Sequence, residues 1–273
     1  MVNAAATWTF DAVFAVIGSW PPLASLALFS LGIAAVMLLV VARTSDQAAM
    51  VSTKRAMHAG LFEIRLFNDD LRAILRAVGQ VLWHNLRYLR LSLVPLLWMA
   101  LPLVLVIAQL QAFYGYAGLV PGQPVLLKAD LSAAGAAPGG VMPALDVPAG
   151  VRVETAAVRL AGSSEVLWRI VPVEEGDYTV TLTAGDRTAS KTVHVSGGIG
   201  RRSPVRVSRD LATQLLYPSE PPLDSGGPMS SISIAYPETA IDVLGFRVHW
   251  LIVFMVLSMA AAFGLAKRLG VTL

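Results

Sequence analysis

Long uninterrupted apolar runs and short alternating ones occupy different parts of this chain. Three long runs carry no charged residue, and each is close to the roughly 20 residues that a helix needs to cross a bilayer. These runs are Leu23 to Ala42, Leu91 to Ala112 and Val248 to Ala266. We therefore predict three transmembrane helices, at residues 23–42, 91–112 and 247–267. Pro95 and Pro102 lie inside the second run, where a kink is expected.

The composition agrees with an integral membrane protein. Charged residues make up 14% of the chain, against about 25% in a typical soluble domain, and the mean hydropathy is +0.63. The net charge of +3 is small and the basic residues are dispersed, so no specific nucleic-acid binding is predicted. The chain contains no cysteine, which excludes disulfides, thiol catalysis and cysteine-ligated metals.

Residues 66–85 have a helical rhythm but are not predicted to cross the bilayer. Asp69, Asp70, Arg72 and Arg76 would each cost about 2.5 to 3.5 kcal/mol near the bilayer centre. The large apolar residues of the same segment return only about 0.3 to 0.6 kcal/mol each. Since the cost exceeds the gain, we expect this segment to lie outside the hydrocarbon, within a basic helical hairpin at residues 43–90.

The position of the hairpin turn has two alternatives. In one, Asn68-Asp69-Asp70 breaks the helix as an N-cap, residues 44–67 run out and residues 70–90 run back. In the other, the chain turns at His58-Ala59-Gly60 and one long helix continues into the second span. Apolar residues at helical spacing predict a face that packs on another helix or on the membrane; they are Ile64, Phe67, Leu71, Ile74, Val78 and Leu82.

Basic residues predict the orientation, because cytoplasmic loops are enriched in lysine and arginine. Residues 1–22 contain none, whereas residues 43–90 contain eight against four acidic residues. Residues 113–246 contain ten basic and thirteen acidic residues, and Lys267-Arg268 follow the third span. We predict an N-terminus outside, a cytoplasmic hairpin, an extracytoplasmic domain and a C-terminus inside, in a bacterial inner (cytoplasmic) membrane. The first apolar run lacks a basic n-region, so it is interpreted as a reverse signal anchor.

The first 22 residues form a separate interfacial segment. Its large apolar residues recur at helical spacing, which predicts a short amphipathic helix on the outer membrane surface; they are Trp8, Phe10, Val13, Phe14, Ile17 and Trp20. The alternative is a disordered tail.

Residues 120–240 change to short alternating runs separated by Gly, Pro, Ser and Asp, which is typical of a β-sandwich. The predicted strands are "PVLLKADLS", "VRVETAAVRL", "EVLWRIVPV", "GDYTVTLTAG" and "RTASKTVHVSG". In the fourth strand, Tyr178, Val180, Leu182 and Ala184 share one face. The fourth and fifth strands form a hairpin that looks like the end of an immunoglobulin-like domain. Trp168 is predicted to be a core residue.

The remainder of this domain is predicted from two short patterns. "SRDLATQLLYP" predicts a short helix capped by Ser208, and "SISIAYP" predicts one more strand. The expected fold class is therefore membrane α-helical, with three transmembrane helices, a cytoplasmic helical hairpin and an inserted extracytoplasmic immunoglobulin-like β-sandwich.

The chain offers little to catalysis. Its four histidines are scattered without metal-binding spacing, and no G-x-S-x-G, P-loop or G-x-G-x-x-G motif occurs. The spans contain no carboxylate, which argues against a proton-coupled transporter. We therefore predict no enzyme activity, no metal and no cofactor. Gln109 and Gln111 are the most polar residues in or near the second span, either as functional groups or as interhelical hydrogen-bonding groups.

The order of the segments resembles the three-span core of the YidC/Oxa insertase superfamily. The resemblance rests on "VARTSDQAAMVSTKRAMHAG" leaving the first span and "EIRLFNDDLRAILRAVGQVLWHNLRYLR" entering the second. The segment "RLFNDDL" is also similar to one in uncharacterised bacterial three-span proteins. The insertase resemblance implies a groove open to cytoplasm and lipid that helps apolar helices enter the bilayer, and a hairpin that meets ribosomes or client segments.

Two functions follow as hypotheses. In the first, the protein is insertase-like, and the candidate groove, client or partner contacts are Arg43, Arg65, Arg72, Arg76 and Gln109. Its partners would be the lipid bilayer, client membrane proteins and the ribosome. In the second, it is a non-enzymatic scaffold or receptor subunit whose hairpin docks a cytoplasmic subunit and whose sandwich binds a periplasmic protein.

Overall fold

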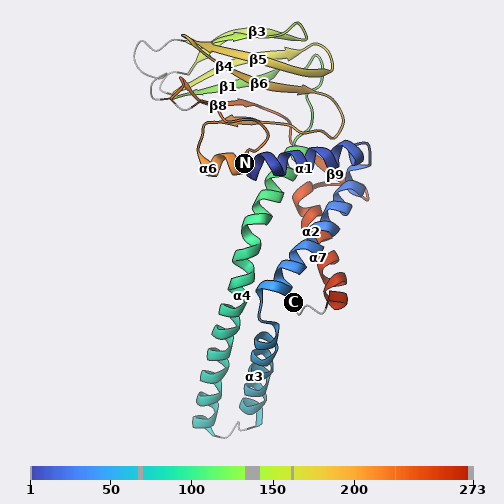
Figure 1. The fold of residues 1–273 in the computed structure, drawn as a ribbon, viewed down its shortest axis with the longest axis vertical. Coiled ribbons are helices and arrows are strands. Elements are labelled where there is room, and N and C mark those ends of the chain that lie inside the picture. The colour runs from blue at the N-terminus through green and yellow to red at the C-terminus, as the bar shows by residue number, and fades with distance from the viewer. Residues whose placement is uncertain (1, 67–69, 133–141, 161–162, 225, 270–273) are drawn as a thin grey trace. The chain divides into compact units, whose positions relative to one another are not determined.

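The computed structural model describes residues 2–66, 70–132, 142–160, 163–224 and 226–269 (Figure 1). It divides into two compact units. The first unit comprises residues 1–25 and 104–250 and contains the β-domain, and the second comprises residues 26–103 and 251–273 and contains most of the helices.

Three helices are long and apolar enough to cross a membrane, as the apolar runs predict: Pro22–Thr44, Ile74–Tyr114 and Trp250–Arg268. They belong to α2 (Pro22–Thr44), α4 (Leu71–Tyr114) and α7 (Trp250–Leu269). At 1.5 Å per residue, the 44 residues of α4 extend roughly 66 Å, about twice the hydrocarbon thickness of a bilayer. The predicted second span and the segment before it therefore form one helix, which contains both Pro95 and Pro102.

A helical hairpin forms where it was predicted. Helix α3 (Gln47–Leu66) ends just before the predicted turn, and α4 starts just after it. Asp70 is the N-cap, because its Oδ1 accepts a hydrogen bond from the Arg72 amide at 2.9 Å. The helix break lies between α3 and α4, as in the first alternative, and Gly60 is inside α3. The second alternative is correct in one respect, because α4 continues as one long helix into the second predicted span. Residues 67–69 lie outside the described residues.

The two arms of the hairpin are antiparallel and close. The Lys54 ammonium lies 5.4 Å from the centre of the Tyr88 ring, and Gly60 faces Val81. A Cβ on Gly60 would lie only 2.6 Å from Val81 Cγ2, so glycine permits this close approach of the arms. Figure 1 shows α3 running beside the first half of α4.

The N-terminal segment is helical, as predicted, and the disordered alternative is wrong for the described residues. Helix α1 (Val2–Ile17) buries Phe14 and Ile17 and leaves Trp8 exposed. The Phe14 ring stacks on Phe113 at a centroid distance of 3.7 Å, and Phe113 lies at the end of α4. This stacking joins α1 to the end of α4 within the first unit.

The β-domain contains two antiparallel sheets. All five predicted alternating runs are strands, and "SISIAYP" supplies another. The larger sheet has the order β3-β4-β1-β8-β7, formed by Val151–Arg159, Glu165–Pro172, Val125–Leu131, Met229–Ile234 and Val205–Val207. The smaller has the order β2-β5-β6, formed by Ala144–Asp146, Gly176–Ala184 and Arg187–Val195.

The core of the β-domain lies between these sheets. Leu127 and Ile170 of the larger sheet and Leu182 of the smaller sheet belong to one cluster, and all three are fully buried. Figure 1 shows strands of both sheets together in this domain. Trp168 belongs to the same cluster, which confirms its prediction as a core residue. The predicted alternation in β5 is also confirmed, since Val180, Leu182 and Ala184 are buried.

Short elements depart from the predictions. Helix α6 (Leu211–Leu216) forms, but its cap is Asp210 rather than Ser208, because Asp210 Oδ2 accepts from the Thr213 amide at 3.1 Å. The three-residue strands β2 and β7 were not predicted. Neither was the hairpin of β9 (Ala240–Val243) and β10 (Phe246–His249), which immediately precedes α7. Such short strands carry too few alternating positions to be recognised in a sequence.

Candidate membrane groove and basic hairpin

An apolar groove of about 260 Å³ lies between the three predicted membrane helices in the second unit. Its lining residues are Ile33, Ala34, Met37, Leu38, Val41, Met99, Leu103, Phe254, Ser258, Met259 and Ala262. Each helix contributes a methionine, whose flexible thioether adapts to different apolar shapes. The polar exception is Ser258, whose Oγ has no hydrogen-bond partner among the described residues. The groove therefore offers a deformable apolar surface.

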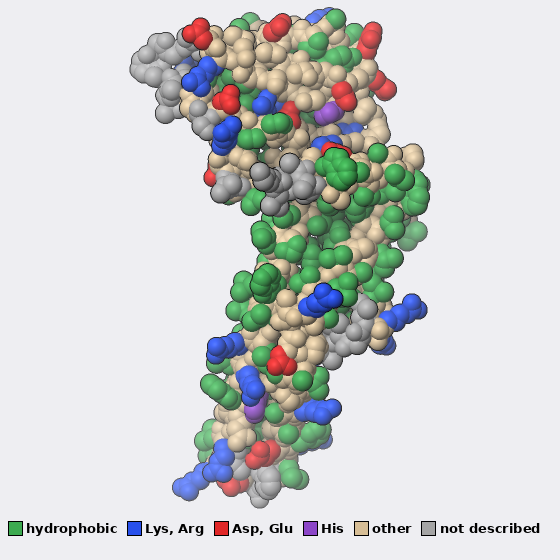
Figure 2. All heavy atoms as spheres, in the orientation of Figure 1, with side chains coloured by type: hydrophobic (Ala, Val, Ile, Leu, Met, Phe, Trp, Pro, Cys, Tyr) green, Lys and Arg blue, Asp and Glu red, His purple; other side chains and the backbone are tan. Residues whose placement is uncertain are grey.

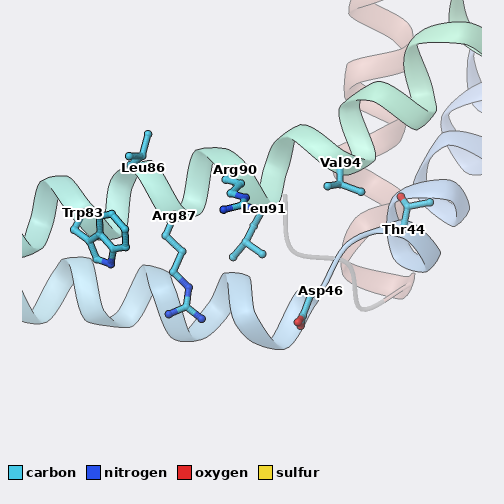
Figure 3. Close-up of a pocket in the computed structure, with 8 residues that line it drawn as sticks. All are labelled: Thr44, Asp46, Trp83, Leu86, Arg87, Arg90, Leu91 and Val94. Carbon is cyan, nitrogen blue, oxygen red and sulfur yellow. The ribbon is translucent and has the colours of Figure 1, made fainter.

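A second hollow of about 550 Å³, which we call the hairpin hollow, lies at the base of the hairpin in the same unit (Figure 3). Its lining residues are Thr44, Asp46, Trp83, Leu86, Arg87, Arg90, Leu91 and Val94. It therefore combines two arginines with large apolar side chains.

Successive stretches of the same two helices line both hollows. On α4 the hairpin hollow reaches Val94 and the groove starts at Met99, a rise of roughly 7.5 Å. On α2 the groove reaches Val41 and the hairpin hollow begins at Thr44, a rise of roughly 4.5 Å. The hairpin hollow thus adjoins the apolar groove along the axes of α2 and α4.

Helix α4 carries two apolar faces in the hairpin. One includes Ala77 and Val81 and faces α3, with Ala77 fully buried. The other, which we call the leucine row, is exposed; it consists of Leu71, Leu75, Val78, Leu82, Leu86 and Leu89. The apolar stripe predicted from the sequence therefore does not form one packed face, because its members Leu71, Val78 and Leu82 belong to the exposed leucine row. Continuous exposed apolar surface of this kind is typical of an interaction site.

The four predicted arginine contacts all lie exposed in the second unit. Arg43 is in the last turn of α2, Arg65 is in the last turn of α3, and Arg72 and Arg76 are near the start of α4. The antiparallel register places Arg65 level with Arg76 near the free end of the hairpin. Figure 2 shows basic side chains distributed among hydrophobic ones over the hairpin. The client or partner role of these arginines stays a prediction.

Gln109 lies in the first unit, and it is not among the residues that line the groove. It is buried, its Nε2 donates to Thr7 Oγ1 at 3.3 Å, and Arg201 Nη1 donates to its Oε1 at 3.0 Å. Arg201 also donates from Nε to Asp11 at 2.7 Å and lies 4.8 Å from the Phe113 ring centre. Gln109 therefore follows the hydrogen-bonding alternative, because it joins α4, α1 and the loop before β7.

A buried ion pair in the β-domain was not predicted. Lys191 is fully buried and pairs with Glu220 at 2.5 Å, while its Nζ donates to Ser203 Oγ at 2.9 Å. Burial lowers the pKa of Lys191, although the Glu220 carboxylate opposes this effect. Burial also acts to raise the pKa of Glu220, but the Lys191 ammonium and hydrogen bonds from Ser203 and the Thr192 amide bring it below its ordinary value.

This cluster has the residue types of a serine–lysine nucleophile pair, but its geometry favours a structural role. A nucleophile and its base lie within about 2.6 to 3.2 Å of each other and must reach substrate. Ser203 and Lys191 are both buried, and Lys191 is paired with a carboxylate. One signal pointed to this site, since Lys191 alternates with the inward-facing Val193 and Val195. Glu220 lies in "PSEPP", which gives no such signal.

The described residues contain no group of three His, Cys, Asp or Glu side chains placed to hold a metal ion. No known protein family matches this chain, and no curated protein matches it. The structure itself shows a protein with three apolar helices long enough to cross a membrane and an antiparallel β-domain.

Proposed function

We propose that this protein is an insertase-like membrane protein that assists the insertion or assembly of apolar helices. The observation that carries the proposal is the adjacency of the hairpin hollow and the apolar groove along α2 and α4. A client helix leaving water would first meet mixed polar and apolar side chains, and then an apolar surface within the spans. The resemblance to the YidC/Oxa superfamily supports the same proposal.

The groove would hold part of the client during transfer. Its three methionines can adjust to clients of different sequence, because methionine has an unbranched and flexible side chain. In lipid, a client gains mainly van der Waals contacts and a few hydrogen bonds from such a groove.

The hairpin would meet the client before the groove does. The leucine row offers apolar contacts, and Arg65, Arg72 and Arg76 offer positive charge at the free end of the hairpin. This combination suits an apolar segment with acidic flanks, or the phosphate surface of a ribosome. In this proposal the hairpin is cytoplasmic, the β-domain is extracytoplasmic, and the membrane is the bacterial inner membrane.

The strand order supports an immunoglobulin-like β-domain. Immunoglobulin domains have one sheet in the order D-E-B-A and another in the order C-F-G. If β1 corresponds to strand B, then β3-β4-β1 correspond to D-E-B and β2-β5-β6 to C-F-G. Strand β8 takes the position of strand A, although it follows the other strands in the chain. An experimental structure in which β8 does not pair with β1 would contradict this assignment.

Reconstitution tests the insertase proposal. The full chain in vesicles should increase the insertion of single-span substrates, measured by protease protection beside a known active insertase. Ala34→Phe fills the groove at a buried lining position, whereas Leu39→Phe changes an exposed position of the same helix that does not line it. If Ala34→Phe removes about 1.4 kcal/mol of client contact, insertion should fall about tenfold.

Two outcomes would overturn this proposal. One is no effect of the wild-type protein under conditions where the control insertase is active. The other is equal insertion by Ala34→Phe, Leu39→Phe and wild-type proteins, because the groove would then contribute nothing. Circular dichroism of each variant shows whether the helices are retained.

The leucine row favours a second candidate function, a scaffold or receptor subunit that docks a partner helix. Leu71, Leu75, Val78 and Leu82 follow the alternating spacing of four and three residues that is typical of helix pairing, and Leu89 lies seven residues after Leu82. In this version the β-domain binds a periplasmic protein. Leu75→Asp and Leu82→Asp should then abolish co-purification of a fixed partner and leave insertion unchanged, whereas retained co-purification would contradict docking through the row.

A further inference from the structure

We propose that the hairpin hollow binds an anionic phospholipid, with the phosphate held by Arg87 and Arg90. This inference goes beyond the proposed function, because lipid binding requires no client. The hollow has a volume of about 550 Å³, which is within the usual range of about 300 to 1,000 Å³ for small-molecule sites.

The ends of the two candidate membrane helices that line the hollow would place it at the level of lipid headgroups. Thr44 is the last residue of α2, which is long and apolar enough to cross a membrane. Arg90 directly precedes the uncharged stretch that begins at Leu91 and is long enough to cross a bilayer. Arginine and tryptophan gather at this boundary because their charged or polar ends remain hydrated while their apolar parts enter the bilayer.

The charges in the hollow are unbalanced. Among the described residues, no ion pair includes Arg87 or Arg90. The one carboxylate of the lining, Asp46, is engaged at the start of α3, where its Oδ1 accepts from the Ala49 amide at 2.9 Å. Two guanidinium groups therefore remain available to an anion, and guanidinium groups bind phosphate oxygens with paired hydrogen bonds.

The apolar part of the lining selects a lipid over a free phosphate. Leu91 and Val94 continue from the arginines toward the bilayer, and Trp83 borders the hollow on the other side. Figure 3 shows Arg87 and Leu91 pointing from α4 toward the start of α3, with Asp46 at that start. A phospholipid satisfies both parts at once, because its phosphate meets the arginines and its glycerol and upper acyl chains meet the apolar side chains.

Lipid retention on the full chain in detergent tests this inference. Phosphatidylglycerol and phosphatidylcholine are titrated separately, and bound lipid is counted by native mass spectrometry. Phosphatidylglycerol should bind saturably and phosphatidylcholine at least tenfold more weakly. Each arginine near an anionic headgroup contributes about 1 kcal/mol, so Arg87→Gln with Arg90→Gln should weaken phosphatidylglycerol binding about 30-fold.

A matched control separates this site from general charge attraction. Arg72→Gln with Arg76→Gln removes the same two charges from the same helix at exposed positions outside the hollow. This control variant should bind phosphatidylglycerol within about twofold of the wild-type affinity. Equal losses in both double variants would overturn the proposal, as would equal binding of the two lipids.

Two further experiments use the unmodified protein. A photoreactive phosphatidylglycerol should cross-link to residues 83–94 or 44–46, and cross-links confined to other regions would overturn the proposal. Inorganic phosphate at millimolar concentration should not displace the lipid. Displacement by phosphate alone would show an anion site without lipid specificity. Because none of these measurements uses a client protein, failure of the insertion assay leaves their result unaffected.

Discussion

The β-domain and the helical hairpin treat their hydrophobic and charged side chains in opposite ways. In the β-domain, leucine and isoleucine side chains from both sheets meet in one core, and the buried Lys191 has a carboxylate partner. In the hairpin, the leucine row is exposed and Arg87 and Arg90 have no ion-pair partner among the described residues. The side chains of the β-domain core find their partners inside the protein, whereas those of the hairpin remain available to another molecule.

This difference indicates where stability and interaction reside. Substitutions that disturb the interior of the β-domain should change its free energy of unfolding, because buried groups lose contacts that nothing replaces. Substitutions along the leucine row should change binding and leave stability nearly unchanged, because those side chains have few contacts to lose.

Removing Lys191 should destabilise the β-domain most. Lys191→Ala leaves the Glu220 carboxylate buried without its cation, which typically costs about 3 to 5 kcal/mol. Hydrogen exchange of the full chain in detergent should show reduced protection in β6 and β7. The combined change Lys191→Met with Glu220→Leu removes both charges, so it should restore most of the loss; a double variant no better than Lys191→Ala would contradict the ion-pair explanation.

Acid should weaken the same pair in the unchanged protein. The folded-state pKa of Glu220 is lowered, so the pair contributes its full stability above the ordinary glutamate pKa of about 4.3. This contribution is lost as the pH falls below that value toward the lowered pKa. Hydrogen exchange of β6, corrected for its intrinsic pH dependence, should show less acid sensitivity in Glu220→Gln than in the wild type.

Two leucine-to-alanine substitutions should separate the regions directly. Leu127 is 0% exposed in the core between the sheets, so Leu127→Ala should cost about 2 to 5 kcal/mol. Leu75 is 63% exposed in the leucine row, so Leu75→Ala should change stability by about 0.5 kcal/mol or less. Thermal unfolding of both variants in detergent measures this contrast. A large loss of stability in Leu75→Ala would mean that the row is covered within the protein.

Two glycine substitutions should show the smallest difference and test the packing of the hairpin. Gly79→Ala meets no atom within 4 Å and should stabilise α4 by about 1 kcal/mol through helix propensity. Gly60→Ala gains the same propensity but clashes with the stiff Val81 side chain at 2.6 Å. The second variant should therefore be about 1 to 3 kcal/mol less stable than the first. Hydrogen exchange of residues 50–66 provides the measurement, and equal protection would contradict close packing of the arms.

The interior of the β-domain shows how far sequence patterns can lead. The alternation of Val180, Leu182 and Ala184 predicted the inner face of β5, and Trp168 was predicted as a core residue, because strands have a strict two-residue period. Lys191 alternates with Val193 and Val195 in the same period, although its burial was not predicted. Its partner Glu220 comes from an irregular segment 29 residues later in the chain, and no periodicity links such positions.

The three apolar helices show the same division. Their existence follows from composition alone, because a bilayer requires about 20 apolar residues with no charges at the centre. Whether Gln109 faces a groove or another helix depends on rotation of the helix and on neighbours distant in sequence. The structure places it against Thr7 and Arg201, which lie about 100 residues away on either side.

Local sequence patterns were enough to predict the three apolar helices, the charged helical hairpin and most strands of the β-domain. Each of these follows from local periodicity or from a transfer free energy summed over adjacent residues. Packing in three dimensions sets which apolar face of α4 lies against α3, which arginines border a hollow, and which polar groups pair in the interior. Those outcomes depend on contacts between residues far apart in the chain, and they are set by the packing of whole elements.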